Sequence, residues 1–220
     1  MKLVIDTANA KEIKRLCEIL NVWGVTTNPT IITREKKPFE EVIKEIDAVL
    51  NEKQMLFIQV VSTDYQSMVE EGRYIASLRK NTAVKIPVTA DGLKAIKTLH
   101  QEGIKILATA ILNANQGFVA ALNGAEYLAP YVNKMSNYTD GIEETVALQQ
   151  MLEANNLDTE IIAASLKNTD QVKQLIRNGI ASVTLPVDIA DLMYLSPVTD
   201  EAINAFTNNW YKAYNKKTLI

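Results

Sequence analysis

Short apolar runs typical of buried β-strands recur along the whole chain, and segments with helical periodicity separate them. We expect these runs to end at or near Asp6, Thr26, Gln59, Lys85, Thr109, Tyr131, Ala164 and Leu185. Successive ends lie 20, 33, 26, 24, 22, 33 and 21 residues apart. Each interval has about the length of one strand–helix unit.

Runs this apolar indicate a parallel sheet that is covered on both faces. Eight such units within 220 residues predict an α/β fold, a single (β/α)8 TIM barrel domain spanning residues 1–220. An open doubly wound sheet is the alternative, but such a sheet commonly has fewer strands and carries a glycine fingerprint that this sequence lacks.

Helix boundary signals occupy the intervals between the runs. Capping-box patterns occur at Asn9–Glu12 and at Thr63–Gln66. Three glycines follow helical segments and precede the next run, as glycines at helix C-termini do: Gly103, Gly124 and Gly179.

An extra C-terminal helix is predicted over about 199–214, outside the repeating units. Its apolar and aromatic stripe consists of Ile203, Phe206, Trp210 and Tyr214. The helix either packs on its own barrel or docks on a neighbouring subunit, since an aromatic stripe also suits an interface. The sequence leaves both interpretations open.

Charge and hydropathy argue against several classes of partner. The net charge is −3 and no block of Lys and Arg occurs, so nucleic acid is not expected. No stretch is long and apolar enough for a membrane span, and the first apolar run is too short for a signal-peptide core. We therefore expect no membrane partner and a cytoplasmic location.

The supply of His and Cys argues against a catalytic metal site. The chain has one histidine, His100, and one cysteine, Cys17, whereas catalytic zinc sites usually draw on several such ligands. His100 lies at a predicted helix end and Cys17 on a helical apolar face, so neither is expected in a nucleophile–histidine arrangement. We expect no metal and no cofactor.

Lys85 is anomalous because it lies within the apolar run Ala83–Pro87. A lysine is almost never fully buried unless it is paired, and burial lowers the pKa of its ammonium group. A lowered pKa supplies the free amine that a Schiff-base nucleophile needs. A lysine whose end reaches solvent is the structural alternative.

Polar residues at the other strand ends make the catalytic interpretation of Lys85 stronger. The active sites of such barrels lie at the C-terminal ends of the strands. There the sequence places Asp6, Thr26, Asn28, Gln59, Thr109, Tyr131, Ser165 and Lys167. Each residue alone has a structural alternative as a turn cap or a rim residue. Their accumulation around one lysine favours a site.

Residue chemistry suggests the roles. Asp6 would pair with the Lys85 iminium. The candidates to activate or position a water are Tyr131, Gln59, Thr109 and Asp6. Gln59 would only orient a water or a hydroxyl, whereas Tyr131 could donate and accept.

Substrate binding is assigned to a second group of residues. Thr26 and Asn28 suit sugar hydroxyls. Ser165 and Lys167, after the seventh strand, with Lys134, would bind a phosphate. A pyridoxal-phosphate enzyme using the same lysine and a non-catalytic phosphosugar-binding barrel are the alternatives from other classes.

Seven motifs carry a resemblance to a known family. They are Asp6–Ala8, Gly24–Pro29, Val84–Thr89, Gly124–Tyr127, Ala129–Asn133, Ala163–Ser165 and Thr184–Pro186. On these motifs the chain resembles the small bacterial transaldolase-like proteins, which include fructose-6-phosphate aldolase. The resemblance implies a Schiff-base lysine at Lys85, no cofactor, sugar phosphates and dihydroxyacetone as ligands, and a ring-shaped homo-oligomer, a pentamer or decamer.

Two activities divide this family, and the resemblance implies which is expected here. Transaldolases typically have Glu where Gln59 stands and Phe where Tyr131 stands, whereas the aldolase branch has Gln and Tyr. The expected activity is therefore a lyase that cleaves fructose 6-phosphate to dihydroxyacetone and glyceraldehyde 3-phosphate. A transaldolase (transferase) of the pentose phosphate pathway is the alternative. Lys134 departs from the aldolase pattern, which has Arg there.

Overall fold

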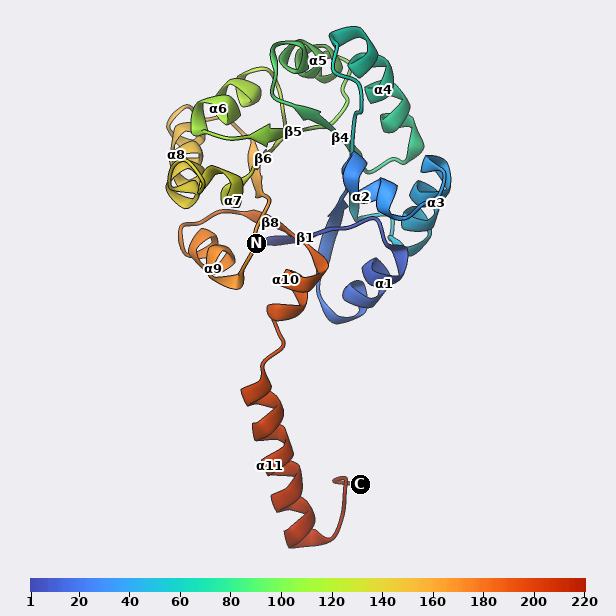
Figure 1. The fold of residues 1–220 in the computed structure, drawn as a ribbon, viewed down its shortest axis with the longest axis vertical. Coiled ribbons are helices and arrows are strands. Elements are labelled where there is room, and N and C mark those ends of the chain that lie inside the picture. Colours follow the sequence, from blue (N-terminus) through green and yellow to red (C-terminus); the bar gives the residue numbers. More distant parts are fainter.

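The computed structural model describes residues 1–220 and has the predicted architecture, a closed barrel of eight parallel strands in sequential order, surrounded by helices (Figure 1). The strands are β1 (Lys2–Asp6), β2 (Val22–Thr26), β3 (Met55–Gln59), β4 (Thr82–Pro87), β5 (Ile106–Ile111), β6 (Tyr127–Pro130), β7 (Glu160–Ala163) and β8 (Ser182–Leu185). β1 pairs with both β2 and β8, which closes the barrel.

Except for the last one, the long helices cover the outside of the barrel, and short ones sit in the loops that leave β2, β6 and β8. The helices are α1 (Ala10–Ile19), α2 (Pro29–Arg34), α3 (Phe39–Val49), α4 (Tyr65–Leu78), α5 (Ala90–Gln101), α6 (Ala114–Leu122), α7 (Val132–Met135), α8 (Gly141–Ala154), α9 (Thr169–Arg177), α10 (Val187–Leu192) and α11 (Pro197–Tyr214).

Apolar side chains form two separate layers. A cluster of 43 buried residues lies between the strands and the helices, and a cluster of 8 fills the interior of the barrel. This division follows from the alternation of side chains along a strand, which sends neighbouring residues to opposite faces. The interior is therefore a packed core rather than a channel.

Helix ends agree with the sequence in most places. Asn9 caps α1 by accepting hydrogen bonds from the main chain of Lys11 and Glu12. The capping box predicted at Thr63 is wrong by one residue, because Asp64 is the cap of α4 and accepts from the Ser67 amide. The three predicted C-terminal glycines all adopt positive φ, which favours glycine: Gly103, Gly124 and Gly179.

The C-terminal helix α11 extends away from the barrel (Figure 1). None of its residues is buried, and Phe206 is 70% exposed. Of the two interpretations that the sequence left open, packing on its own barrel is therefore excluded by the structure. No helix combines the length and the apolar character that crossing a bilayer requires.

The ends of four strands differ from the prediction, and β7 ends one residue before the expected Ala164. β4 continues to Pro87 and β5 to Ile111, beyond the expected ends at Lys85 and Thr109. β6 ends one residue before Tyr131, which still forms a single parallel bridge with Ala164. The longer β5 contains an irregularity in its pairing with β6.

Candidate active site

An apolar layer closes the barrel interior just below the C-terminal ends of the strands. It includes Val4, Phe57, Ala83, Leu107 and Ala129. Side chains two residues further along the same segments return to the same face. These next residues are Asp6, Gln59, Lys85, Thr109 and Tyr131. The five predicted catalytic residues thus form a polar layer directly above an apolar one.

Lys85 lies inside the barrel with only 5% of its surface exposed. Its Nζ atom donates a hydrogen bond of 2.7 Å to the main-chain carbonyl of Thr27. Burial lowers the pKa of the Lys85 ammonium below its ordinary value of 10.5, and the negative charge of Asp6 opposes this shift. The structure therefore presents an amine that loses its proton more easily than a surface lysine.

Two threonine side chains, linked by a hydrogen bond, hold the carboxylate of Asp6. The hydroxyl of Thr26 donates to Oδ1 of Asp6 at 2.7 Å, and the same oxygen of Thr26 lies 2.6 Å from Oγ1 of Thr184. Thr26 is buried and was predicted to bind substrate. Its hydroxyl is engaged with Asp6, so its direct effect is to orient that carboxylate.

Gln59 lies beside Lys85, because the two residues are register partners on the paired strands β3 and β4. Its Oε1 atom is buried and has no hydrogen-bond partner in the protein. A buried acceptor without a partner is costly. This oxygen is therefore available to accept a hydrogen bond from a water or a substrate hydroxyl.

Thr109 and Tyr131 form a hydroxyl pair on the far side of Lys85 from Gln59. Oγ1 of Thr109 donates to Oη of Tyr131 at 3.1 Å, and Thr109 is fully buried. Because the tyrosine oxygen accepts this bond, its own proton remains available for donation to another group.

Lys134 follows Tyr131 closely and covers its ring. Its Nζ atom lies 4.7 Å from the ring centroid, within the range of a cation–π contact. The ammonium group is otherwise exposed to solvent, so it can move from the ring to an anion.

The other two residues predicted to bind phosphate lie in the neighbouring loop, between β7 and α9. Ser165 adopts a left-handed conformation with φ of 60°, and its carbonyl accepts from the Asn133 amide. Lys167 is exposed, and its side chain makes no hydrogen bond or ion pair in the protein. The structure thus places Lys134, Ser165 and Lys167 in adjacent loops without joining them by a contact.

Asn28 caps α2 through its side-chain oxygen, which accepts from the Ile31 amide at 3.0 Å. The structural alternative considered for this residue, a cap, is therefore present. The side-chain amide nitrogen makes no hydrogen bond within the protein, so Asn28 can still donate to a ligand.

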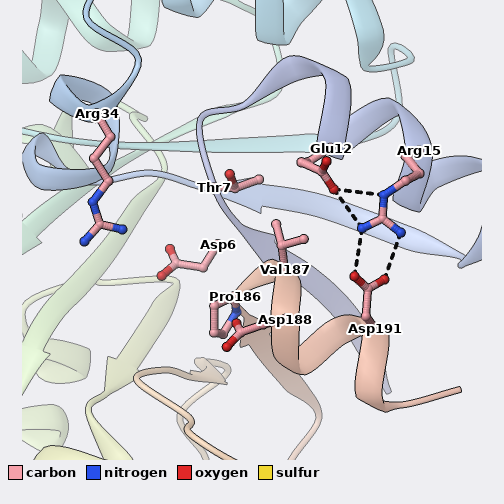
Figure 2. A pocket seen from close by; sticks show the side chains of 9 residues that line it. All are labelled: Asp6, Thr7, Glu12, Arg15, Arg34, Pro186, Val187, Asp188 and Asp191. Atoms are coloured by element: carbon pink, nitrogen blue, oxygen red, sulfur yellow. Dashed lines mark hydrogen bonds and ion pairs between the residues drawn. The ribbon is translucent and has the colours of Figure 1, made fainter. Parts of the chain in front are cut away.

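An open pocket of about 590 Å³ adjoins the barrel mouth at Asp6. Figure 2 shows Arg15 joined to Glu12 and Asp191 on one side, Arg34 on the other, and Asp6 between them. The paired Arg15 and Asp191 tie α1 to α10. Lys85 is not among the residues that line this pocket.

Two groups in contact with site residues were not predicted, the Thr184 hydroxyl beside Thr26 and the Thr27 carbonyl beside Lys85. Thr184 occurs in one of the family motifs, and a polar residue in the apolar run Ser182–Leu185 was the available signal. The carbonyl of Thr27 belongs to the main chain and has no signature in a sequence. No group of three or more His, Cys, Asp or Glu side chains is placed to hold a metal ion.

Comparison with known proteins gives one family and one fold. A family model described as Transaldolase/Fructose-6-phosphate aldolase matches residues 3–218. Two solved structures of a flavocytochrome b2 mutant, one with pyruvate bound and one with sulfite bound, are similar with a TM-score of 0.62 each. Their sequences are 15% and 16% identical and cover 85% and 84% of this chain, which spans 56% of theirs. This likeness shows the barrel fold alone.

Proposed function

The chain belongs to the transaldolase/fructose-6-phosphate aldolase family, and on that premise we propose that it is a cofactor-free aldolase. The reaction is the reversible cleavage of fructose 6-phosphate to dihydroxyacetone and glyceraldehyde 3-phosphate, with Lys85 as the nucleophile. These substrates belong to carbohydrate metabolism, in the pentose phosphate pathway. We also propose that the enzyme works in the cytoplasm.

Catalysis begins when the Lys85 amine attacks the ketone carbon C2 of fructose 6-phosphate. Loss of water converts the carbinolamine to an iminium, whose positive charge lies near Asp6. The C4 hydroxyl passes its proton to the carboxylate of Asp6, the C3–C4 bond breaks, and the bonding electrons move into the iminium. Glyceraldehyde 3-phosphate leaves, and an enamine of dihydroxyacetone remains on Lys85.

Release of dihydroxyacetone then requires a proton and a water. The enamine takes up a proton at C3, and water hydrolyses the resulting iminium to return the free amine. Tyr131 supplies the proton, because its hydroxyl accepts from Thr109 and keeps its own hydrogen for donation. Gln59 orients the water through its unpaired buried Oε1.

Binding of the sugar phosphate uses the rim of the barrel. Lys134, Ser165 and Lys167, in the loops after β6 and β7, hold the phosphate group. Asn28 donates to a substrate hydroxyl through its free amide nitrogen. Thr26 acts through Asp6, whose carboxylate it orients.

The observation that favours an aldolase over a transaldolase is the hydroxyl of Tyr131. A proton donor at the enamine lets dihydroxyacetone leave without waiting for an aldehyde acceptor. The test is to incubate the protein with fructose 6-phosphate alone and measure glyceraldehyde 3-phosphate. We expect continuous release. Release only after addition of erythrose 4-phosphate would reject the aldolase in favour of the transaldolase.

We also propose that the protein assembles into a ring-shaped homo-oligomer, a pentamer or decamer. The support is α11, which extends from the barrel with exposed apolar residues such as Ile203 and Phe206. Apolar side chains on an extended helix are stabilised when a second surface covers them. Light scattering of the native protein should give five or ten times the chain mass of 24.5 kDa, and a monomer, dimer or other mass would contradict the proposal.

A further inference from the structure

β5 contains one more residue than the segment of β6 with which it pairs. Ala108 is opposite Leu128 and Ile111 is opposite Pro130, so three steps along β5 match two along β6. Ala110 lies in this interval and has φ of 58°. A strand residue with a left-handed conformation beside a register shift is a β-bulge, and bulges are frequent next to active sites.

The bulge changes the face to which the end of β5 points. Leu107 belongs to the interior cluster and Ala108 to the outer one, as alternation requires. Ile111 shares the parity of Leu107 and Thr109, yet it is fully buried in the outer cluster. If the same residues formed a regular strand without the bulge, alternation would turn this isoleucine into the mouth of the barrel.

Two main-chain hydrogen bonds fix the strand on either side of Ala110. The Thr109 carbonyl accepts from the Val88 amide at 3.0 Å, which ties it to the end of β4. The Ile111 carbonyl accepts from the Tyr131 amide at 2.9 Å, which ties it to the end of β6. Ala110 therefore lies between two anchored residues of β5. One is bonded to the end of β4, the strand that carries Lys85, and the other is bonded to Tyr131, which follows β6.

The hydroxyl pair of Thr109 and Tyr131 depends on this arrangement. Thr109 immediately precedes the bulge, and Tyr131 is bonded through its amide to the residue immediately after it. The Oγ1–Oη distance of 3.1 Å joins the same two segments through their side chains. A change of backbone conformation at residue 110 would move one hydroxyl relative to the other.

We propose that Ala110 is a positioning residue of the aldolase reaction: its left-handed conformation sets the Thr109–Tyr131 pair over Lys85 and keeps Ile111 out of the mouth. This inference rests on the proposed function. A left-handed conformation outside glycine is costly and persists only where the surroundings impose it. Apart from glycine, alanine is the residue whose small side chain conflicts least with a left-handed backbone, whereas a β-branched side chain conflicts strongly with it.

The test compares Ala110→Val with Ala110→Gly. Valine should drive the backbone out of the left-handed region and lower kcat for fructose 6-phosphate cleavage at least about tenfold, with little change in KM, because small displacements of catalytic groups are expensive. Glycine, which adopts positive φ freely, should keep kcat within about threefold of the wild-type value.

Asn156→Val is the matched control. Asn156 has φ of 53°, is exposed, and lies in the turn between α8 and β7, at the opposite end of the barrel. Valine there introduces the same backbone conflict, so Tm should fall in both valine variants. Only the substitution at residue 110 should lower kcat.

A second readout separates this inference from the aldolase assignment. Borohydride trapping of dihydroxyacetone on Lys85 should be slower in Ala110→Val but reach the same final labelling, because Lys85 on β4 is intact. Wild-type protein that labels without cleaving fructose 6-phosphate contradicts the aldolase, not the positioning role. Trapping by Ala110→Val as fast as by wild type, or equal losses of kcat in Asn156→Val, would overturn the positioning role. A wild-type protein that never labels overturns both.

Discussion

The Nζ atom of Lys85 lies 2.7 Å from the carbonyl oxygen of Thr27 and donates a hydrogen bond to it, inside the barrel. A carbonyl accepts from an ammonium and from a neutral amine alike, so this contact fixes the direction of the nitrogen without holding its charge. Asp6 is the group whose charge favours the protonated form, and burial has the larger, opposite effect. The net effect is an oriented amine whose pKa is lower than that of a surface lysine.

The lowered pKa of Lys85 should be visible in stability as a function of pH. Between the lowered pKa and the ordinary value of 10.5, the unfolded chain binds a proton at Lys85 and the folded chain does not. Stability therefore rises with pH across this window. Urea unfolding between pH 7 and pH 10 should show the difference between wild type and Lys85→Met changing in favour of wild type, by at most about 1.4 kcal/mol per pH unit. A difference that is constant with pH would mean an unperturbed lysine.

The charge of Asp6 should tune the reactivity of Lys85. Asp6 raises the pKa of the ammonium group against the effect of burial, so Asp6→Asn should lower that pKa further. The pH midpoint for the rate of borohydride trapping with dihydroxyacetone should then shift to lower pH. Turnover should fall at the same time, because the iminium loses its counter-charge. A midpoint at the same or higher pH would show that Asp6 does not act on Lys85.

Removal of the Tyr131 hydroxyl should lower the rate of acceptor-free cleavage more than the rate of transfer to an aldehyde. Tyr131→Phe leaves Thr109 without its acceptor and the enamine without its proton donor. Acceptor-free release of glyceraldehyde 3-phosphate should fall about 100-fold, within the usual range for a general acid, while transfer to erythrose 4-phosphate survives better.

The control for that variant is Tyr138→Phe, because Tyr138 is 86% exposed and lies outside the site. It should cleave fructose 6-phosphate at the wild-type rate. Equal losses of cleavage and transfer in Tyr131→Phe would argue that the hydroxyl has only a structural role.

Replacement of Lys134 should weaken the binding of phosphorylated substrates only. Lys134→Met should raise KM for fructose 6-phosphate about tenfold, because a charge-assisted contact to phosphate is lost, and leave reactions of unphosphorylated aldehydes unchanged. Lys134→Arg should keep or improve KM, since a guanidinium binds phosphate in a bidentate manner. Lys53→Met, at an exposed site in the loop between α3 and β3, is the control. Equal effects on both substrate classes would reject the phosphate contact.

The order of strands and helices follows from the sequence because apolar runs and their spacing are visible in it. The backbone conformation of a single residue is harder to predict from the sequence. The irregularity in β5 is formed by Ala110, not by a glycine, so no residue type signals it, and the predicted end at Thr109 was two residues short.

Some contacts of the site could not be predicted from the sequence, for similar reasons. Alternation explains why Asp6, Gln59 and Lys85 reach one interior layer, and that was predictable. The contact of Lys85 with the Thr27 carbonyl was not, because main-chain acceptors have no sequence signature. The direction of α11 also could not be predicted, since its apolar stripe suits a helix packed on either its own barrel or another subunit.

The most direct test of the central claim is borohydride reduction of the protein with dihydroxyacetone, followed by mass spectrometry of the peptides. We expect one covalent adduct per chain, on the peptide that contains Lys85, and none in Lys85→Met. An adduct on another lysine, or equal labelling of the Lys85→Met variant, would contradict the assignment of Lys85 as the Schiff-base nucleophile.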